Sequence, residues 1–223
     1  MQDKPQVSGF LPFWEQLSDL EKQTAERSAS FRRFSSGASI YSGSAGCMGL
    51  VCVLSGELRV YILSPEGREI TLFRLKSGQE CLLTASCALK AITFEVHADA
   101  DKDTQLMIIG AKAFELLMKN NIHVEAFAYR SLTEQFSQVM FVMQQMLFQR
   151  FDRRLAAFLL DETDKTVSRS LQLTHEQIAR YLGSAREVVS RMLKYFMEDG
   201  LVSLSRGGLK VLDAKKLKLI ASA

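Results

Sequence analysis

The sequence lacks the apolar segments that mark membrane and secreted proteins. No run of about 18 apolar residues, the length a membrane-spanning helix needs, occurs in the chain. Near the start, Asp3, Pro5, Pro12 and Glu15 are wrong for the apolar core of a targeting signal. With 47% hydrophobic and 24% charged residues, the composition is that of a soluble globular protein. We therefore expect no membrane partner and a cytoplasmic location.

Residues that would build a catalytic or metal site are also scarce. The chain has four cysteines, and none shows the Cys-x-x-Cys spacing of zinc sites. Cysteines without a framework spacing fit a reducing compartment. The sequence contains no nucleophile–base pair, paired-carboxylate site or Walker-type loop. We expect that the protein is not an enzyme, and we predict no cofactor.

Residues 173–202 predict two helices joined by a tight turn. Thr174 opens a capping box with Gln177, and an apolar stripe at helical spacing follows. Gly183 can adopt the positive φ that ends a helix, and we expect Ser184 to cap the second helix. This arrangement is typical of a helix-turn-helix.

The second predicted helix has one apolar face and one charged face. The charged face carries Arg186, Glu187, Ser190, Arg191 and Lys194. An arginine can bond bidentately to guanine, and a glutamate can accept a hydrogen bond from the cytosine amino group. Residues near the start of such a helix reach furthest into a DNA major groove. A face that is merely solvated is the alternative, but the capping signatures, the glycine turn and a following basic hairpin together favour DNA.

A β-hairpin is expected after this helix. Residues 201–204 and 209–212 are strand-like and flank Arg206, so they predict the wing of a winged helix. Residues 151–223 hold 13 Lys and Arg against 9 Asp and Glu, whereas residues 1–150 hold 15 against 16. The excess positive charge therefore coincides with the predicted DNA-reading segment, as a DNA contact surface requires.

The segment Gly183–Arg191, with the sequence GSAREVVSR, resembles the recognition-helix signature of the Crp/Fnr family of transcription regulators. The family pattern is Arg-Glu-x-x-(Gly/Ser)-Arg after a glycine turn. The resemblance implies that Arg186, Glu187 and Arg191 contact bases, with Ser190 at a position that some branches also use. The full set of DNA-contact residues that we expect is Thr174, His175, Ser184, Arg186, Glu187, Ser190, Arg191, Lys194 and Arg206.

The N-terminal half carries the pattern of an antiparallel β domain. Short stretches that are β-branched or alternate in polarity are separated by turn glycines, and they cover residues 40–41, 49–54, 57–63, 69–75, 91–97 and 104–109. Closely spaced short strands of this kind favour an antiparallel barrel or jelly roll. Residues 1–28 predict a short helical lead-in whose apolar cluster docks on that domain. Members of the family carry a β-roll here, and the resemblance implies the same fold.

A long helix is expected from about Ile122. A coiled-coil seam with 3-4-3-4-3 spacing is formed by Tyr129, Leu132, Phe136, Val139, Met143 and Met146. Other apolar residues lie off this seam, so one stripe is available for the roll and one for a second protomer. A single helix lying across the roll is the alternative. The family uses this helix as its dimer axis.

These patterns predict an α+β chain in three parts. Residues 1–120 form an N-terminal antiparallel β-roll (a double-stranded β-helix or jelly roll), residues 121–150 a long dimerisation helix, and residues 151–223 a C-terminal winged helix-turn-helix. The expected partners are double-stranded DNA, a second copy of the chain, RNA polymerase and an unknown small-molecule effector. Two rivals are a small-molecule-binding module whose winged helix contacts protein, and a cupin-like enzyme, which would need a histidine-rich metal site.

The expected effector is not a cyclic nucleotide. Cyclic-nucleotide binders of the family carry a Gly-Glu pair and, some ten residues on, an Arg-Ser pair whose arginine meets the phosphate. Residues 78–97 contain neither pair, and Glu95 brings a carboxylate that would repel a phosphate, with Lys90 the only nearby cation. The effector pocket that we predict consists of Glu80, Cys81, Leu82, Cys87, Phe94, Tyr129, Leu132 and Phe136.

Three sensor alternatives remain at the level of the sequence. Free cysteines are most often small buried hydrophobes, but Cys81 and Cys87 could serve a redox or soft-metal sensor. The iron–sulfur cluster of the oxygen-sensing branch is not expected, because no cysteine precedes Cys47. Haem-binding relatives exist, and His97 is the only histidine in the predicted roll, but a lone histidine is more often structural.

Overall fold

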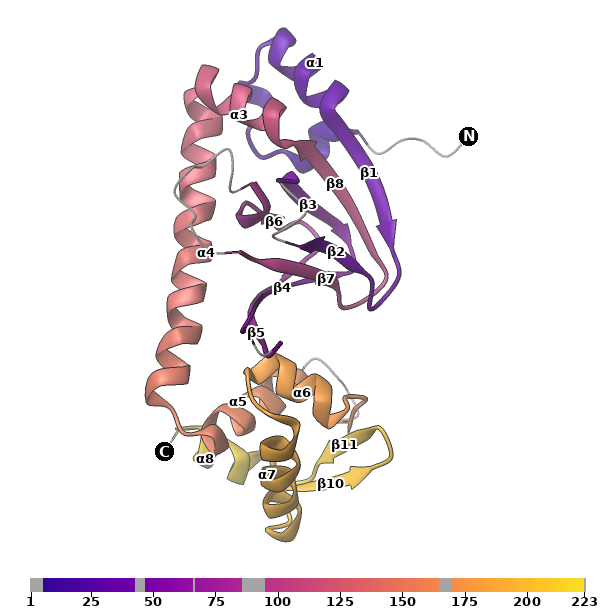
Figure 1. Cartoon of the computed structure of the whole chain (residues 1–223), viewed down its shortest axis with the longest axis vertical. Coiled ribbons are helices and arrows are strands. Elements are labelled where there is room, and N and C mark those ends of the chain that lie inside the picture. Colours follow the sequence, from indigo (N-terminus) through magenta and orange to yellow (C-terminus); the bar gives the residue numbers. More distant parts are fainter. Residues whose placement is uncertain (1–5, 43–46, 66, 86–94, 165–169, 223) are drawn as a thin grey trace. The chain divides into compact units, whose positions relative to one another are not determined.

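The computed structural model describes residues 6–42, 47–65, 67–85, 95–164 and 170–222 (Figure 1). The chain divides into two compact units. The roll unit comprises residues 1–62 and 72–139, and the C-terminal unit comprises residues 63–71 and 140–223. The predicted boundaries at residues 120 and 150 stay a prediction, because this division falls inside one long helix. Within the described residues, no helix is long and apolar enough to span a membrane.

Two four-stranded sheets form the roll. The first has the strand order β1 (Ala29–Phe34), β8 (Thr104–Gly110), β3 (Gly49–Ser55) and β6 (Glu80–Cys81). The second has the order β2 (Ser39–Ser42), β7 (His97–Ala100), β4 (Glu57–Leu63) and β5 (Glu69–Lys76). Strand pairs in both sheets run antiparallel, including β1 with β8, β3 with β8 and β4 with β7. The prediction of an α+β chain with an N-terminal antiparallel β-roll is therefore confirmed.

Alternation along β3 supplies two separate cores. Val51 and Val53 belong to the core shared with residues of the second sheet, such as Val60. Leu50 and Cys52 belong to a second core on the opposite face of the first sheet. Successive side chains of a strand point to opposite faces, so an apolar run such as this one is buried on both sides.

Helical segments cover the face of the first sheet that carries the second core. They are η1 (Val7–Phe10), η2 (Trp14–Gln16), α1 (Asp19–Ser28), α3 (Ala111–Asn120) and the start of α4 (Ile122–Phe148). The predicted capping box at Ser18 and Glu21 opens α1. The predicted docking of the lead-in is confirmed, because Leu11 and Phe13 are buried and the Phe13 ring packs on Phe127 at 5.0 Å.

Several strands differ from the expectation. Residues 91–94 of the strand predicted over residues 91–97 lie outside the described part of the chain, residues 95 and 96 are not in a strand, and β7 begins at His97. Strand β1 was missed, and so were the two-residue strands β6 and β9 (Ser170–Leu171). The sequence of β1, ASFRRF, alternates poorly because the strand lies at a sheet edge and pairs only with β8. Charged side chains are common on edge strands, where they discourage pairing with the strands of another molecule.

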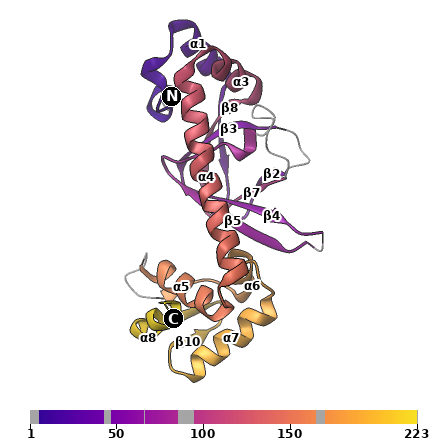
Figure 2. The same ribbon diagram turned by 90° about the vertical axis from the view of Figure 1, so that its left-hand side faces the viewer.

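One continuous helix, α4, carries the predicted seam (Figure 2). Leu132 and Val139 are half-buried and pack against the core between the sheets. Tyr129, Phe136 and Met143 are instead exposed, at 58%, 64% and 46%. The six seam residues therefore do not share one environment.

The C-terminal unit is a small helical bundle with a three-stranded sheet. Its elements are α5 (Phe151–Asp164), β9 (Ser170–Leu171), α6 (His175–Leu182), α7 (Arg186–Glu198), β10 (Val202–Ser205), β11 (Gly208–Val211) and α8 (Ala214–Ser222). The sheet order is β10-β11-β9. One core, containing Leu159, Ile178, Leu193 and Leu209, joins the helices to the sheet. The predicted winged helix-turn-helix is confirmed.

Gly49 provides a test of this packing. Its φ is +109°, and an added Cβ would meet the carbonyl oxygen of Ile109 and the amide nitrogen of Ala111. Gly37 also has a positive φ of +83°, but a Cβ there would meet nothing within 4 Å. We expect Gly49→Ala to lower the free energy of unfolding by roughly 3 kcal/mol or more, because strain and a backbone clash combine. Gly37→Ala should cost only about 1–2 kcal/mol.

Urea denaturation followed by tryptophan fluorescence would measure both changes in the roll unit, since Trp14 is the single tryptophan. Equal losses for the two variants would contradict the close approach at Gly49.

Candidate nucleic-acid interface

The turn between α6 and α7 is built by backbone hydrogen bonds. The predicted capping box opens α6: the hydroxyl of Thr174 accepts from the Gln177 amide at 3.2 Å, and the Gln177 side chain accepts from the Thr174 amide at 2.8 Å. At the other end, Gly183 has φ 58° and ψ 45°. The amides of Gly183 and Ser184 donate back to Arg180 and Ala179, the pattern of a Schellman motif.

Glycine is required at position 183 for two reasons. Its left-handed conformation strains any residue with a Cβ. A Cβ there would also run into the terminal methyl of Met146 and approach Ile70 at 3.1 Å. Met146, the last of the predicted seam residues, is thus placed against this turn.

Ser184 does not cap the second helix, and that prediction was wrong. The N-cap of α7 is Ala185, whose carbonyl accepts from Val188 and Val189, and no side chain caps the helix. The Schellman motif explains the difference, because it uses the Ser184 amide to close α6 and delays the start of α7 by one residue.

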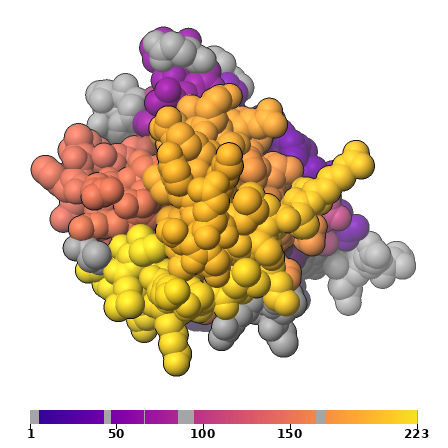
Figure 3. Space-filling model, turned by 90° about the horizontal axis from the view of Figure 1, so that it is seen from below, coloured from indigo at the N-terminus to yellow at the C-terminus, as the bar shows by residue number. Residues whose placement is uncertain are grey.

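The two faces of α7 have the polarity that the sequence predicted. Val189, Leu193 and Phe196 are buried in the core. The side chains of Arg186, Glu187, Arg191 and Lys194 are exposed, and Ser190 is half-buried. Glu187 and Arg191 are one turn apart and lie on the same side of the helix. In the space-filling view, the residues of the C-terminal unit that are coloured orange to yellow form a continuous surface (Figure 3).

The wing follows α7 directly. Strands β10 and β11 pair from Val202 with Val211 to Ser205 with Gly208, and Arg206 is exposed in the turn between them. The missed strand β9 adds a third member, with Leu171 opposite Leu209. Two residues are too few for a periodic pattern, so no signal in the sequence marked β9.

A surface depression of about 400 Å³ lies where α6, α7 and the wing approach one another. Thr174, His175 and Arg186 line it together with Ser205 and Gly207 of the wing. Three of the predicted DNA-contact residues therefore line one concave surface. The lining brings the guanidinium of Arg186 and the carboxylate of Glu176 to the same depression.

His175 and Ser190 are joined across the turn. The Nδ1 atom of His175, in the first residue of α6, lies 2.8 Å from the hydroxyl of Ser190 on α7. Burial lowers the pKa of His175 below its usual 6.5, and the positive charge of Arg186 lowers it further. The ring is therefore neutral at pH 7.

Arg154 is a structural contributor that we did not anticipate. Its Nη1 donates to the carbonyl of Leu182 at 3.1 Å, at the end of α6, and its guanidinium lies 5.6 Å above the ring of Phe151. Burial lowers the pKa of this arginine. An arginine among the apolar residues of α5 was the available signal, because a charged group on an inward helix face needs a partner.

Comparison with known proteins agrees with this geometry. The model of the Crp-like helix-turn-helix domain matches residues 153–220. A crystal structure assigned to the Crp/Fnr family of transcriptional regulators, from Eubacterium rectale, is 42% identical to this chain with a TM-score of 0.92. The match covers 96% of this chain and 100% of that one. The chain belongs to the Crp/Fnr family.

More distant relatives agree with this membership. The cyclic AMP receptor protein of Thermus thermophilus is 27% identical over 181 residues, which are 81% of this chain and 82% of that protein. A CRP/FNR-family regulator from the same organism, at 24% identity and a TM-score of 0.66 over 87% of this chain and 99% of its own, shares the fold. This Crp/Fnr protein is a transcription regulator with a helix-turn-helix DNA-binding domain.

In this Crp/Fnr protein the predicted effector residues that the structure describes lie in different surroundings. Cys87 and Phe94 lie outside the described residues. Cys81 and Leu82 are fully buried and face different cores. Tyr129 and Phe136 are exposed on α4. Cys81 and Leu82 face different cores because successive side chains of an extended chain point to opposite sides.

Glu80 does face α4, through two buried polar residues that the sequence analysis missed. Its carboxylate accepts a hydrogen bond from the hydroxyl of Ser131 at 2.7 Å. Gln135, one turn further on, donates to the Glu80 carbonyl at 3.1 Å and accepts from the Leu82 amide at 3.3 Å. Both side chains are buried. Polar residues on an otherwise apolar helix face were the signal, because buried polar groups need hydrogen-bond partners.

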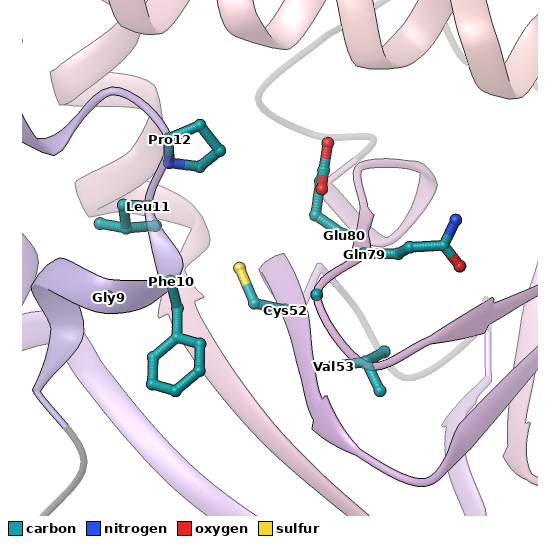
Figure 4. Close-up of a pocket in the computed structure, with 9 residues that line it drawn as sticks. Gly9, Phe10, Leu11, Pro12, Cys52, Val53, Gln79 and Glu80 are labelled. Atoms are coloured by element: carbon teal, nitrogen blue, oxygen red, sulfur yellow. The ribbon is translucent and has the colours of Figure 1, made fainter.

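Glu80 also borders a small pocket in the roll unit (Figure 4). Phe10 and Pro12 of the lead-in line one side, and Cys52 of β3 lines the other. Its volume is about 160 Å³. That volume is below the range of about 300–1,000 Å³ that is usual for a drug-sized ligand.

The two free cysteines in the described part of the chain, Cys52 and Cys81, do not have the features of a thiolate sensor. Burial raises the pKa of Cys81 to about 11 and that of Cys52 to about 12, so both are neutral thiols at pH 7. A sensor cysteine needs an accessible thiolate, so Cys81 does not suit the redox or metal alternative. Cys47 is disulfide-bonded, which departs from the expectation of a reducing compartment.

Two further alternatives find no support in the described residues. No three His, Cys, Asp or Glu side chains there are grouped as ligands of a metal ion. The ring of His97 stacks on that of Tyr61, with 5.4 Å between the ring centroids.

The environment of His175 predicts its titration. NMR titration of the imidazole should give a pKa below 6.5, because burial opposes the charged form and Arg186 repels it. In Arg186→Gln the pKa should rise but stay below 6.5, since burial remains. The unfolded chain takes up this proton at higher pH, so the C-terminal unit should lose stability as the pH falls through 6.5. A pKa at or above 6.5 in the wild type would contradict this environment.

Proposed function

We propose that this regulator acts as a homodimer that reads an inverted-repeat operator through α7, under the control of a small-molecule effector. The observation that carries the proposal is the exposed face of α7, where Arg186, Glu187 and Arg191 point away from the core. A helix of this kind enters the major groove with its first residues against base edges. The site of action is the cytoplasm, where the DNA lies.

Each DNA-contact residue has a proposed role. Arg186 and Arg191 read guanines bidentately, and Glu187 accepts from a cytosine amino group, within a half-site that contains TGA. Ser190 faces a neighbouring base pair. The remaining contacts are to phosphates, which set register without reading sequence, and they come from Thr174, His175, Ser184, Lys194 and Arg206.

The dimer interface that we propose is shifted from the predicted seam. The exposed stripe of α4 consists of Tyr129, Thr133, Phe136, Met140, Met143 and Leu147. This set keeps a 4-3-4-3-4 spacing, which is again that of a coiled-coil seam. Leu132, Val139 and Met146 occupy the neighbouring stripe, and they are half-buried within their own protomer. Five of these six residues are apolar, and an exposed apolar stripe of this size is unusual unless a partner covers it.

The effector that we propose is not a cyclic nucleotide. The family cassette arginine is missing from residues 78–97. In the described part of this region, the carboxylate of Glu80 lies next to α4, and its negative charge would repel a phosphate. Burial of Cys81 makes a thiolate-based sensor a poor alternative. RNA polymerase is proposed as the partner through which bound protein alters transcription.

Base readout can be tested by selecting binding sites from randomised DNA. Glu187→Ala should lose the preference at one base pair of each half-site, at a cost of about 1–3 kcal/mol, because one specific contact is removed. Arg206→Ala, on the wing, should weaken binding to all sequences alike and flatten the salt dependence. If Glu187→Ala changed no single position, α7 would not lie in the groove as proposed. If the wild type selected no sequence at all, a winged helix that contacts protein would be the better reading.

The dimer can be tested by sedimentation. Phe136→Glu should yield a monomer at micromolar concentration, because two charges would be buried facing each other without partners. Gln138→Glu adds the same charge at an exposed position of α4 off the stripe, and it should leave the dimer intact. A monomeric wild type, or two variants of equal mass, would overturn the proposed interface.

A further inference from the structure

The hydrogen bond between His175 and Ser190 connects the two helices of the helix-turn-helix at the face proposed for DNA. His175 is the first residue of α6, and Ser190 is the fifth residue of α7. The two side chains are 15 positions apart in sequence and 2.8 Å apart in space. Both are half-buried, so this bond is made at the edge of the surface rather than in the core.

A serine hydroxyl alone is an ambiguous reader of DNA. It holds one proton to donate and two lone pairs to accept with, and it rotates to suit its surroundings. In a major groove it can therefore bond to donors, such as the amino groups of cytosine and adenine, or to acceptors, such as the oxygens of guanine and thymine. A hydroxyl that is free to rotate discriminates poorly between base pairs.

An imidazole that accepts through Nδ1 removes this ambiguity. If Nδ1 accepts the hydroxyl proton, the lone pairs of Ser190 alone face outward, and they can meet only a donor. If Nδ1 carries the proton and donates, Ser190 still presents its own proton and one lone pair, and it can meet either kind of partner. The tautomer with an unprotonated Nδ1 is therefore the one that makes Ser190 a selective reader.

We propose that His175 is a positioning residue for base readout: it holds the Ser190 hydroxyl in one orientation and so decides which class of base Ser190 reads. The inference rests on the proposed function, since it requires α7 in a major groove. It replaces the phosphate contact proposed above for His175 with a role that acts through Ser190. Arg186, which borders the same depression, keeps the ring neutral and so keeps one nitrogen available as an acceptor.

The experiment is binding-site selection on randomised DNA with the full-length protein. His175→Ala should flatten the preference at a single base pair in each half-site, and it should leave intact the positions read by Arg186, Glu187 and Arg191. Affinity for the best wild-type site should fall about 3- to 10-fold, the effect of losing one hydrogen bond. His175→Asn should restore the preference, because its side-chain amide can occupy the place of Nδ1. Glu176→Ala changes the adjacent exposed residue and is the matched control: it should keep the wild-type preference at every base pair.

A double-mutant comparison separates this role from a merely structural one. In a Ser190→Ala background, His175→Ala should have no further effect on selectivity, because the two residues act as a unit. An equal effect with and without Ser190, a uniform loss at all positions, or no change at any position would overturn the proposal. These outcomes differ from failure of the proposed function itself, in which the wild type would already select no half-site.

Discussion

The left-handed turn at Gly183 is the constraint on which the DNA-reading part of the molecule depends. Two backbone hydrogen bonds close α6 there, and the following residues can then start α7 only at Arg186. Arg154 holds the carbonyl of Leu182 beside the turn. The turn therefore sets both the direction of α7 and the residue with which it begins, and the base-reading side chains follow from that starting point.

The stability of the roll depends on a different feature: its first sheet is buried on both faces. Strand β3 contributes to two cores at once, and the helical segments and the second sheet occupy its opposite sides. A sheet of this kind is insulated from water, so its buried cysteines remain protonated thiols. Most apolar residues of the roll are buried, whereas the apolar residues of the exposed stripe of α4 face solvent.

Much of this architecture could be predicted from local patterns. The capping box at Thr174, the turn glycine and the amphipathic α7 are strong signals, because each depends on residues close together in sequence. The features that the sequence did not predict depend on contacts between segments that are distant in the chain. Ser184 was predicted to cap α7, but the closure of α6 uses its amide. Which apolar residues of α4 the roll covers also depends on the fold, and their spacing in the sequence does not show it. The bond from His175 to Ser190 has no sequence signature at all.

The pairing of β6 with α4 has a mechanical consequence. Ser131 and Gln135 are one helical turn apart, and both bond to groups of β6 or of the residue that follows it. Apolar contacts tolerate gradual sliding, but hydrogen bonds weaken steeply once their angle is lost. The three hydrogen bonds therefore fix the register of α4 against β6, and a shift of the helix along its own axis would break all of them.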